Sequence, residues 1–301
     1  MSDIVDKLIV IRDVKMDRIC VGLPHPRDER ITFDEESHTY TWDGDRKKMS
    51  ATSFVAMFYD KFDEETTIQN IVSRELYPTD KYYGMTAEQI ADLWAELRET
   101  GSRLGSLLHA QIEDFYVKGE IPGEPIDGWD NFVQFEEELD KERYIPYRAE
   151  WCIYSEISGV PGMIDMIYYD KQNDSYVVCD WKRCKCISDA TFQQEYMYPP
   201  VNSVKASTLG KYTLQVNYYT WVLEKHYGLN VTEICVVNVH PNRPTYETFV
   251  IEKQSELVDK MVQVLEPNHK TLTQVETTLK QGEQFLLAKG WAIKGLEETS
   301  G

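Results

Sequence analysis

The stretch SYVVCDWKRCK, residues 175–185, gives the strongest indication of the fold and of a site. Its apolar first half is typical of a buried strand, yet an acid and an amine, Asp180 and Lys182, follow closely. Because side chains alternate between the two faces of a strand, Asp180 and Lys182 share one face, and Cys179 and Trp181 share the other. Charged side chains beside a core need partners, so we expect the face of Asp180 and Lys182 to form a site.

The preceding strand is predicted over residues 159–170 and contains the sequence GMID, which ends at Asp165. The turn chemistry of KQNDS between the two strands predicts a tight connection, which brings Asp165 near Asp180. Two carboxylates at one place are what Mg²⁺ or Mn²⁺ selects, and such an ion polarises a phosphoryl oxygen and lowers the pKa of water. Lys182 is then placed to stabilise charge that develops on the phosphorus. The alternative is a structural cluster of salt bridges.

GMID followed by DWK resembles the PD-(D/E)xK nuclease superfamily, whose signature is G-x-x-D on one strand and (D/E)-x-K on the next. The resemblance implies an α/β fold of the restriction-endonuclease type, a mixed sheet flanked by helices, here with a helical N-terminal region. Over residues 101–227 the chain is similar to the RecB-like exonuclease branch, which includes Cas4, lambda-type and mitochondrial genome-maintenance exonucleases.

Other positions carry the resemblance to that branch. Gly105 and His109 in GSLLHAQIE match its G…H helix, and Glu150 in YRAEW matches the acid on the strand before G-x-x-D. Gln215 and Tyr219 match its Q-x-x-x-Y helix. The chain departs from the family after the lysine, where it has Arg183 in place of the usual Thr or Ser. That departure bears on fine positioning and leaves the metal site intact.

The resemblance implies two overlapping sets of site residues. The catalytic set is Asp165, Asp180, Lys182, Gln215 and Tyr219. The set that would hold Mg²⁺ or Mn²⁺ is His109, Glu150, Asp165 and Asp180. The helical pair Gln215 and Tyr219 would contact DNA phosphate or orient the strand that carries the lysine; alternatively, these two side chains only pack.

A net charge of −19 argues against a protein that coats nucleic acid electrostatically. Basic residues nevertheless follow the DWK motif, and tyrosines lie among them, which suits contact with phosphates and stacking of bases. The candidate nucleic-acid-binding residues are Arg183, Lys185, Lys205, Lys211 and Tyr212. The alternative is a tyrosine-rich loop that packs on the core.

The composition bounds the class of protein. The chain has 301 residues, of which 42% are hydrophobic, enough for a large core. No apolar run approaches the roughly 18 residues that a membrane span needs. Six cysteines in a chain of this length indicate reduced thiols, so we expect an intracellular, reducing compartment.

The chain is expected to have three parts: an N-terminal hairpin and helical region at 1–85, a nuclease core at 86–266, and a C-terminal helix and tail at 267–301. The turn dipeptide Asp43-Gly44 predicts a hairpin, and Thr86 with Gln89 predicts a capping box. Helices are expected at 62–77, from 87 through the WAELRE segment, at 101–119, at 208–228 and before Pro267. Strands are expected at 147–156, 159–170, 175–183, 233–241 and 246–252.

These features together predict a metal-dependent deoxyribonuclease, an exonuclease acting on DNA ends or single strands. Its partner would be DNA and not a membrane. A catalytically inactive nuclease fold that binds DNA or serves as a scaffold is one alternative. An RNA-cutting endonuclease would use the same residues and is the other.

Overall fold

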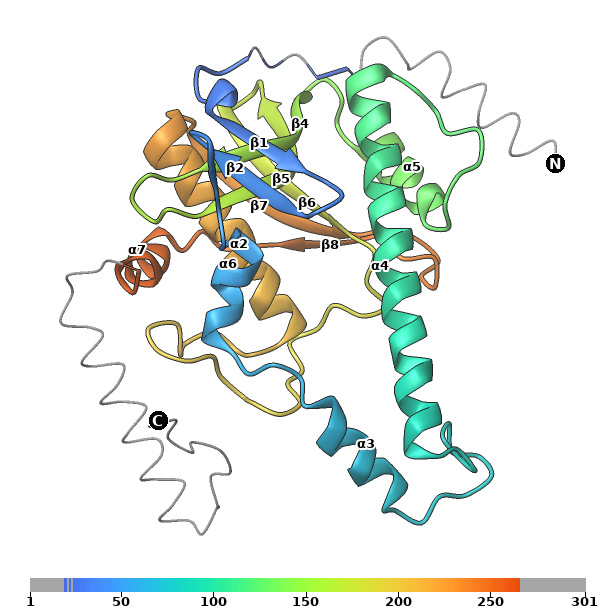
Figure 1. The fold of residues 1–301 in the computed structure, drawn as a ribbon. Coiled ribbons are helices and arrows are strands. Elements are labelled where there is room, and N and C mark those ends of the chain that lie inside the picture. The colour runs from blue at the N-terminus through green and yellow to red at the C-terminus, as the bar shows by residue number, and fades with distance from the viewer. Residues whose placement is uncertain (1–18, 21, 23, 266–301) are drawn as a thin grey trace.

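The centre of the molecule is a five-stranded sheet with the strand order β4-β5-β6-β7-β8 (Figure 1). The structure, a computed structural model, describes residues 19, 20, 22 and 24–265, so the predicted C-terminal helix and tail lie outside the described residues. The strands are β4 (Tyr144–Tyr154), β5 (Pro161–Asp170), β6 (Ser175–Lys182), β7 (Val231–Asn238) and β8 (Glu247–Val250). Neighbouring strands run antiparallel except β6 and β7, which run parallel. The predicted α/β class with a mixed sheet is confirmed.

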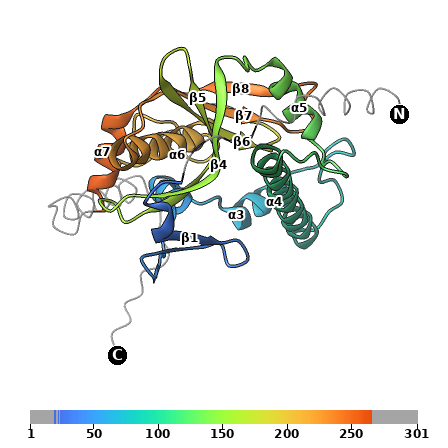
Figure 2. The same ribbon diagram turned by 90° about the horizontal axis from the view of Figure 1, so that it is seen from above.

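Helices cover both faces of this sheet, which gives three layers (Figures 1 and 2). One face packs against α2 (Ala51–Val55), α6 (Thr208–Val222) and α7 (Ser255–Gln263), and the other packs against α4 (Ala87–Lys118) and α5 (Trp129–Glu138). On β6, Val178 faces the first core, whereas Cys179 and Trp181 face the second. The alternation predicted for this strand is therefore confirmed, and it leaves Asp180 and Lys182 on the face opposite Trp181.

Helix α4 is one continuous helix of 32 residues, about 48 Å long at 1.5 Å per residue. Its start is confirmed: the Thr86 hydroxyl accepts from the Gln89 amide, and the Gln89 side chain accepts from the Thr86 amide. Its end is confirmed at Gly119, which has the left-handed φ of 66° that glycine tolerates. The two segments that the sequence predicts separately, one through WAELRE and one from Gly101, are joined into this helix.

Only the C-terminal half of α4 packs deeply against the sheet, through Leu108, Ile112 and Phe115. The N-terminal half projects away from the sheet, with α3 (Glu64–Val72) beside it (Figure 1). The Arg98 guanidinium of α4 pairs with the Glu64 carboxylate of α3. We call this projecting helical hairpin the arm.

The N-terminal region is not purely helical, which corrects the expectation from the sequence. The strands β1 (Ile31–Asp34), β2 (Thr39–Trp42) and β3 (Asp45–Arg46) form a small antiparallel sheet. The predicted turn Asp43-Gly44 is confirmed between β2 and β3, with φ of 50° and 80°. Alternating apolar residues explain the sheet, because Ile31, Tyr40 and Trp42 form a third small core with Tyr154 of β4.

Several short elements complete the chain. Helix α5 was not predicted; its buried residues Trp129, Phe132 and Phe135 pack on Trp181 and its neighbours. Two 3₁₀ turns cover Asp28–Arg30 and Ala56–Phe58, and a π turn at Leu223–Tyr227 extends α6 to Gly228. Residues 188–207 form a long connection without a regular helix or strand. Among the described residues, no helix is both long enough and apolar enough to cross a membrane.

The turn between β5 and β6 is fixed by Asp170, whose side chain is fully buried. Its carboxylate accepts two hydrogen bonds from the Arg143 guanidinium, at 3.0 and 2.7 Å, and further bonds from Gln172 and Asn173. The hydrogen bonds from Arg143 come first among the causes that hold the pKa of Asp170 well below its usual range. This turn sets the register of the two strands that carry Asp165 and Asp180.

We expect Asp170→Asn to lower the melting temperature at pH 7 by about 2–4 °C, because a neutral amide loses the charge-assisted bonds to Arg143. The pKa of Asp170 is depressed in the folded state, so its stabilisation is present above the unfolded-state pKa of about 4 and is lost as the pH falls. The difference between the two proteins should therefore shrink below about pH 4 in thermal melts. A difference that stays constant from neutral to acid pH would contradict this.

Candidate metal centre

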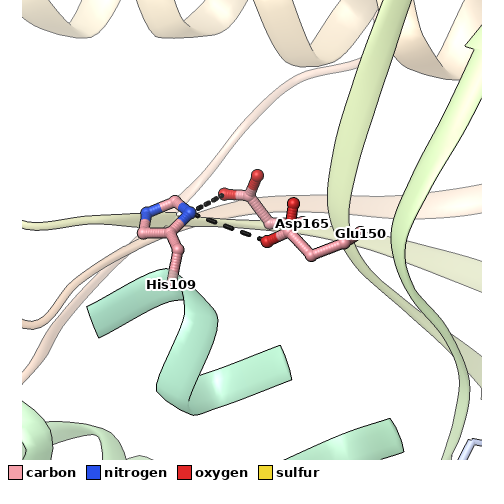
Figure 3. A group of neighbouring side chains, drawn as sticks. All are labelled: His109, Glu150 and Asp165. Atoms are coloured by element: carbon pink, nitrogen blue, oxygen red, sulfur yellow. Dashed lines mark ion pairs between the residues drawn. The ribbon is translucent and has the colours of Figure 1, made fainter. Parts of the chain in front are cut away.

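Three side chains from three elements meet between helix α4 and the sheet (Figure 3). His109 comes from α4, Glu150 from β4 and Asp165 from β5. The His109 Nδ1 atom lies 3.7 Å from Glu150 Oε1 and 3.7 Å from Asp165 Oδ2. One ligand atom from each residue lies within 4.8 Å of the others, close enough for a single ion to contact all three. One imidazole nitrogen and two carboxylates are a donor set that suits Mn²⁺ or Mg²⁺.

Asp165 is positioned by the separation of two strands. The paired register of β5 and β6 ends at Met166 and Cys179, so Asp165 and Asp180 stand where the strands part. The Trp181 backbone amide of β6 donates instead to Asp165 Oδ2, at 2.7 Å. The carboxylate thus takes the place of a backbone carbonyl as the acceptor of this amide. This bond holds the Asp165 side chain where β5 and β6 separate.

Glu150 has an unusual backbone. Its neighbours Ala149 and Trp151 pair with Met166 and Ile164, so Glu150 lies opposite Asp165. Its φ is 43°, in the left-handed region that a residue with a side chain rarely adopts. The other described non-glycine residues with positive φ, which are His38, Asp43 and Asp174, lie in turns, whereas Glu150 lies within a strand. Strain of this kind gathers at functional sites, so the backbone supports a role for Glu150.

We expect Glu150→Gly to unfold at a higher temperature than Glu150→Ala, because glycine adopts a left-handed φ at about 1 kcal/mol less cost than alanine. Both variants remove the carboxylate, so their difference reports the backbone alone. At Thr248, an exposed position of β8, the order should be reversed, because glycine weakens an ordinary strand. Thermal melts of the four variants check both signs; an alanine variant at 150 more stable than the glycine variant would show that the backbone is unstrained.

Asp180 and Lys182 contact each other on β6, as their shared face predicts. The Lys182 ammonium forms an ion pair with Asp180 Oδ2 and lies 3.9 Å from Asp165 Oδ2. Asp180 is 1% exposed and lies outside the group of three potential ligands. The structure therefore places Asp180 against the lysine and Asp165 against the histidine. An ion pair between these two residues is also what the salt-bridge alternative predicts.

Burial dominates the electrostatics of the site. It raises the pKa of Asp180 to about 6, against the opposing effect of Lys182, and it also raises the pKa of Asp165 and of Glu150. Burial disfavours protonated His109, yet the carboxylates of Asp165 and Glu150 outweigh this and raise its pKa. Desolvated carboxylates gathered in this way favour a bound cation.

Gln215 and Tyr219 form one hydrogen-bonded unit on α6. The Gln215 side-chain amide donates to the Tyr219 hydroxyl at 2.9 Å and to Thr52 Oγ1 at 3.1 Å. The Tyr219 ring lies on Gly162, where a Cβ atom would stand 2.6 Å from the ring. The glycine of GMID and the tyrosine of the predicted Q-x-x-x-Y pair therefore contact each other, and a side chain at position 162 would displace the ring.

The predicted nucleic-acid-binding residues have different partners, and one of them lies at the site. The Tyr212 ring lies 5.2 Å from the Lys182 ammonium and so belongs to the site. The Lys211 ammonium lies 4.1 Å above the Tyr59 ring. The Lys205 ammonium pairs with Asp189 at 2.8 Å, which partly neutralises it.

Arg183 and Lys185 follow the motif in a loop. Arg183 Nε donates to the Asp127 carbonyl, and Lys185 is exposed. Both lie beyond the end of β6.

Sequence reasoning missed two residues near the site, Thr52 and Tyr40. Thr52 accepts from Gln215. Tyr40 of β2 is buried near the carboxylates: desolvation first, and then the charges of Glu150 and Asp165 among others, raise its pKa. Both lie in the N-terminal region, outside every motif. The Asp43-Gly44 turn and the alternation in TYTW indicate a strand at Tyr40, but neither signal brings it to the carboxylates.

No protein-family model matches the chain, and no curated protein matches it closely enough to count as a relative. Among solved structures, the chain is similar to a candidate exonuclease from Eubacterium rectale, at 13% identity and a TM-score of 0.32, over 74% of this chain and 71% of that one. It is also similar to the protein SSO0001, at 12% identity and a TM-score of 0.25, over 68% of this chain and 85% of that one. Both likenesses are distant.

Proposed function

We propose that the chain is a metal-dependent nuclease that hydrolyses phosphodiester bonds of DNA at ends or in single strands. The observation that supports this most is the convergence of His109, Glu150 and Asp165 within ligand distance, with Lys182 3.9 Å from Asp165. A purely structural cluster of charges gains nothing from a strained backbone at Glu150.

Each side chain has a separate task in this proposal. His109, Glu150 and Asp165 would hold Mg²⁺ or Mn²⁺, and the ion when bound would polarise a phosphoryl oxygen and acidify a water molecule. Asp180 orients the Lys182 ammonium toward Asp165 and the reacting phosphate. Lys182 donates hydrogen bonds to that phosphate as negative charge grows on its oxygens. The water oxygen bonds to phosphorus, the bond to one bridging oxygen breaks, and a proton ends on the departing oxygen.

Release of nucleotides from labelled DNA tests the proposal. Purified protein should cleave linear single-stranded DNA when Mn²⁺ is supplied, and excess chelator should stop the reaction until Mn²⁺ is restored. Closed circular single strands should persist much longer than linear ones, because an exonuclease needs an end. Glu99→Gln, at an exposed position of the same helix as His109 and outside the group of three potential ligands, serves as a matched control that should retain cleavage.

Other outcomes favour the alternatives. Equal cleavage of circles and linear strands would indicate an endonuclease, and faster cleavage of matched RNA would indicate an RNA substrate. Binding of DNA without cleavage under any divalent ion would indicate an inactive nuclease fold.

A further inference from the structure

Exposed aromatic side chains gather on the arm and on the connection 188–207 that faces it. Phe192 is 78% exposed and Phe62 is 52% exposed, although phenylalanine is ordinarily buried. Tyr77 and Tyr83 of the arm are exposed as well. A concentration of this kind on one part of a surface marks a place where something binds.

Two of these rings, Phe192 and Phe62, form a row with two half-buried rings, Trp94 and Tyr82. The Phe192 ring lies 6.3 Å from the Phe62 ring, which lies 5.8 Å from the Trp94 ring on α4. Trp94 lies 6.0 Å from Tyr82, and its indole nitrogen donates to the Tyr82 hydroxyl at 2.9 Å. We call Tyr82, Trp94, Phe62 and Phe192 the aromatic row; it crosses from the arm to the connection 188–207.

Hydrogen bonds hold together the two segments that carry Phe62 and Phe192. The Asp60 amide donates to the Gln194 side chain at 2.8 Å, and the Tyr198 amide donates to the Phe58 carbonyl at 2.7 Å. These bonds join the chain just before α3 to the connection that carries Phe192. That connection then leads into α6, where Tyr212 lies beside Lys182. The row is therefore a preformed surface, and its Trp94 lies about 22 Å along α4 from His109 of the candidate metal centre.

From this geometry we infer that the aromatic row binds the bases of a single-stranded nucleic acid whose backbone enters the candidate metal centre, an inference that rests on the proposed function. Stacking on rings is uncharged and tolerates any base, because every base has a π face. A chain with a net charge of −19 repels phosphates, and Arg98 beside the row is already paired with Glu64. Binding of the strand therefore comes from stacking of its bases on the rings. In a duplex the bases are stacked on one another and are not accessible to the rings.

Binding of a fluorescein-labelled oligothymidine tests the inference, with Ca²⁺ in place of the catalytic ion and the length of the oligonucleotide checked afterwards. Phe192→Ala and Phe62→Ala should each weaken binding by about tenfold, the effect of losing one stacked base. Phe192→Tyr should bind as the wild type does, because the ring is kept, whereas Phe192→Leu should bind as weakly as the alanine variant. Ile157→Ala is the control: the Ile157 side chain is about as exposed as that of Phe62, and its loss should leave the affinity unchanged.

An abasic oligonucleotide of the same length separates base stacking from phosphate contacts. It should bind the wild type about as weakly as the oligothymidine binds Phe192→Ala, and the Phe192→Ala substitution should then have no further effect. Equal binding of wild type and Phe192→Ala to the oligothymidine, or full retention of affinity by Phe192→Leu, would overturn the inference. The latter would show that apolar contact, and not stacking on a ring, holds the oligonucleotide.

A small chromogenic phosphodiester, too short to reach the row, separates hydrolysis at the candidate metal centre from binding by the aromatic row. Phe192→Ala should hydrolyse it at the wild-type rate while degrading long single strands more slowly at low substrate concentration. If the wild type hydrolyses DNA and the row variants lose neither binding nor rate, the row has no part in substrate binding and the nuclease proposal stands. If the wild type hydrolyses neither substrate but binds the oligothymidine through Phe192, the nuclease proposal is wrong and the aromatic row still binds bases.

Discussion

Replacing Asp165 by asparagine is expected to abolish Mn²⁺ binding and to lower cleavage of single-stranded DNA by at least roughly 10³-fold, because Lewis-acid activation of the phosphate is lost. Asn is a sharp choice here. Its side-chain oxygen can still accept the bond that the Trp181 amide donates, so the gap between β5 and β6 keeps its shape while one anionic ligand disappears.

Calorimetry with Mn²⁺ measures the loss of affinity, and melting temperatures measured with and without Mn²⁺ provide an independent reading. An ion that binds only the folded protein stabilises it by RT ln(1 + [L]/Kd), so Mn²⁺ should raise the melting temperature of the wild type and not of Asp165→Asn. In chelator, the two proteins should melt at similar temperatures. Unchanged Mn²⁺ affinity in the variant would remove Asp165 from the metal centre.

Replacing Lys182 by methionine should lower the turnover number by about 10²- to 10³-fold, because a donor to the transition state is lost while the three potential ligands remain. Mn²⁺ affinity should change little. The substitution also leaves Asp180 buried without its ammonium partner, so stability should fall by about 3 kcal/mol.

The double variant Lys182→Met with Asp180→Asn resolves these two effects. It removes the unpaired charge, so it should recover stability but not turnover. Rates are compared well below the melting temperature of the weaker variant. A Lys182→Met protein that turns over at the wild-type rate would exclude the lysine from the mechanism.

The part of the site that the sequence predicts is the part that short-range geometry determines. The period of a strand places Asp180 and Lys182 on one face, and a tight turn between β5 and β6 brings Asp165 to Asp180. The helical spacing of four residues brings the Gln215 amide to the Tyr219 hydroxyl. Each of these contacts depends on a register or a repeat that can be counted along the chain.

The rest depends on partners far apart in sequence. The pairing of Asp180 with Lys182, and of Asp165 with His109 and Glu150, is decided by how α4 packs on the sheet, which no local pattern specifies. The residues next to Glu150 in the sequence do not predict its left-handed φ.

Two fold differences have local causes. Gly101 weakens a helix by about 1 kcal/mol, so it suggests a break, yet packing of the C-terminal half of α4 and its two caps keep the helix continuous. Helix α5 was missed because it follows a polar stretch and because its N-cap, Gly128, provides no side-chain cap. Packing of its apolar face on the sheet, and not a capping residue, stabilises this helix.

The continuity of α4 makes it a mechanical lever. About 33 Å of rigid helix separates Ala87 at the start of α4 from His109, and the helix contacts the sheet next to that histidine, through Leu108 and Ile112. If the arm tilts by 10° about this contact, its tip travels about 6 Å, whereas a side chain beside the pivot moves by only about 1 Å. A large displacement of the arm would therefore move the His109 side chain by only about 1 Å. A shift of that size would change the distance from the histidine to a bound ion without removing the histidine from the site.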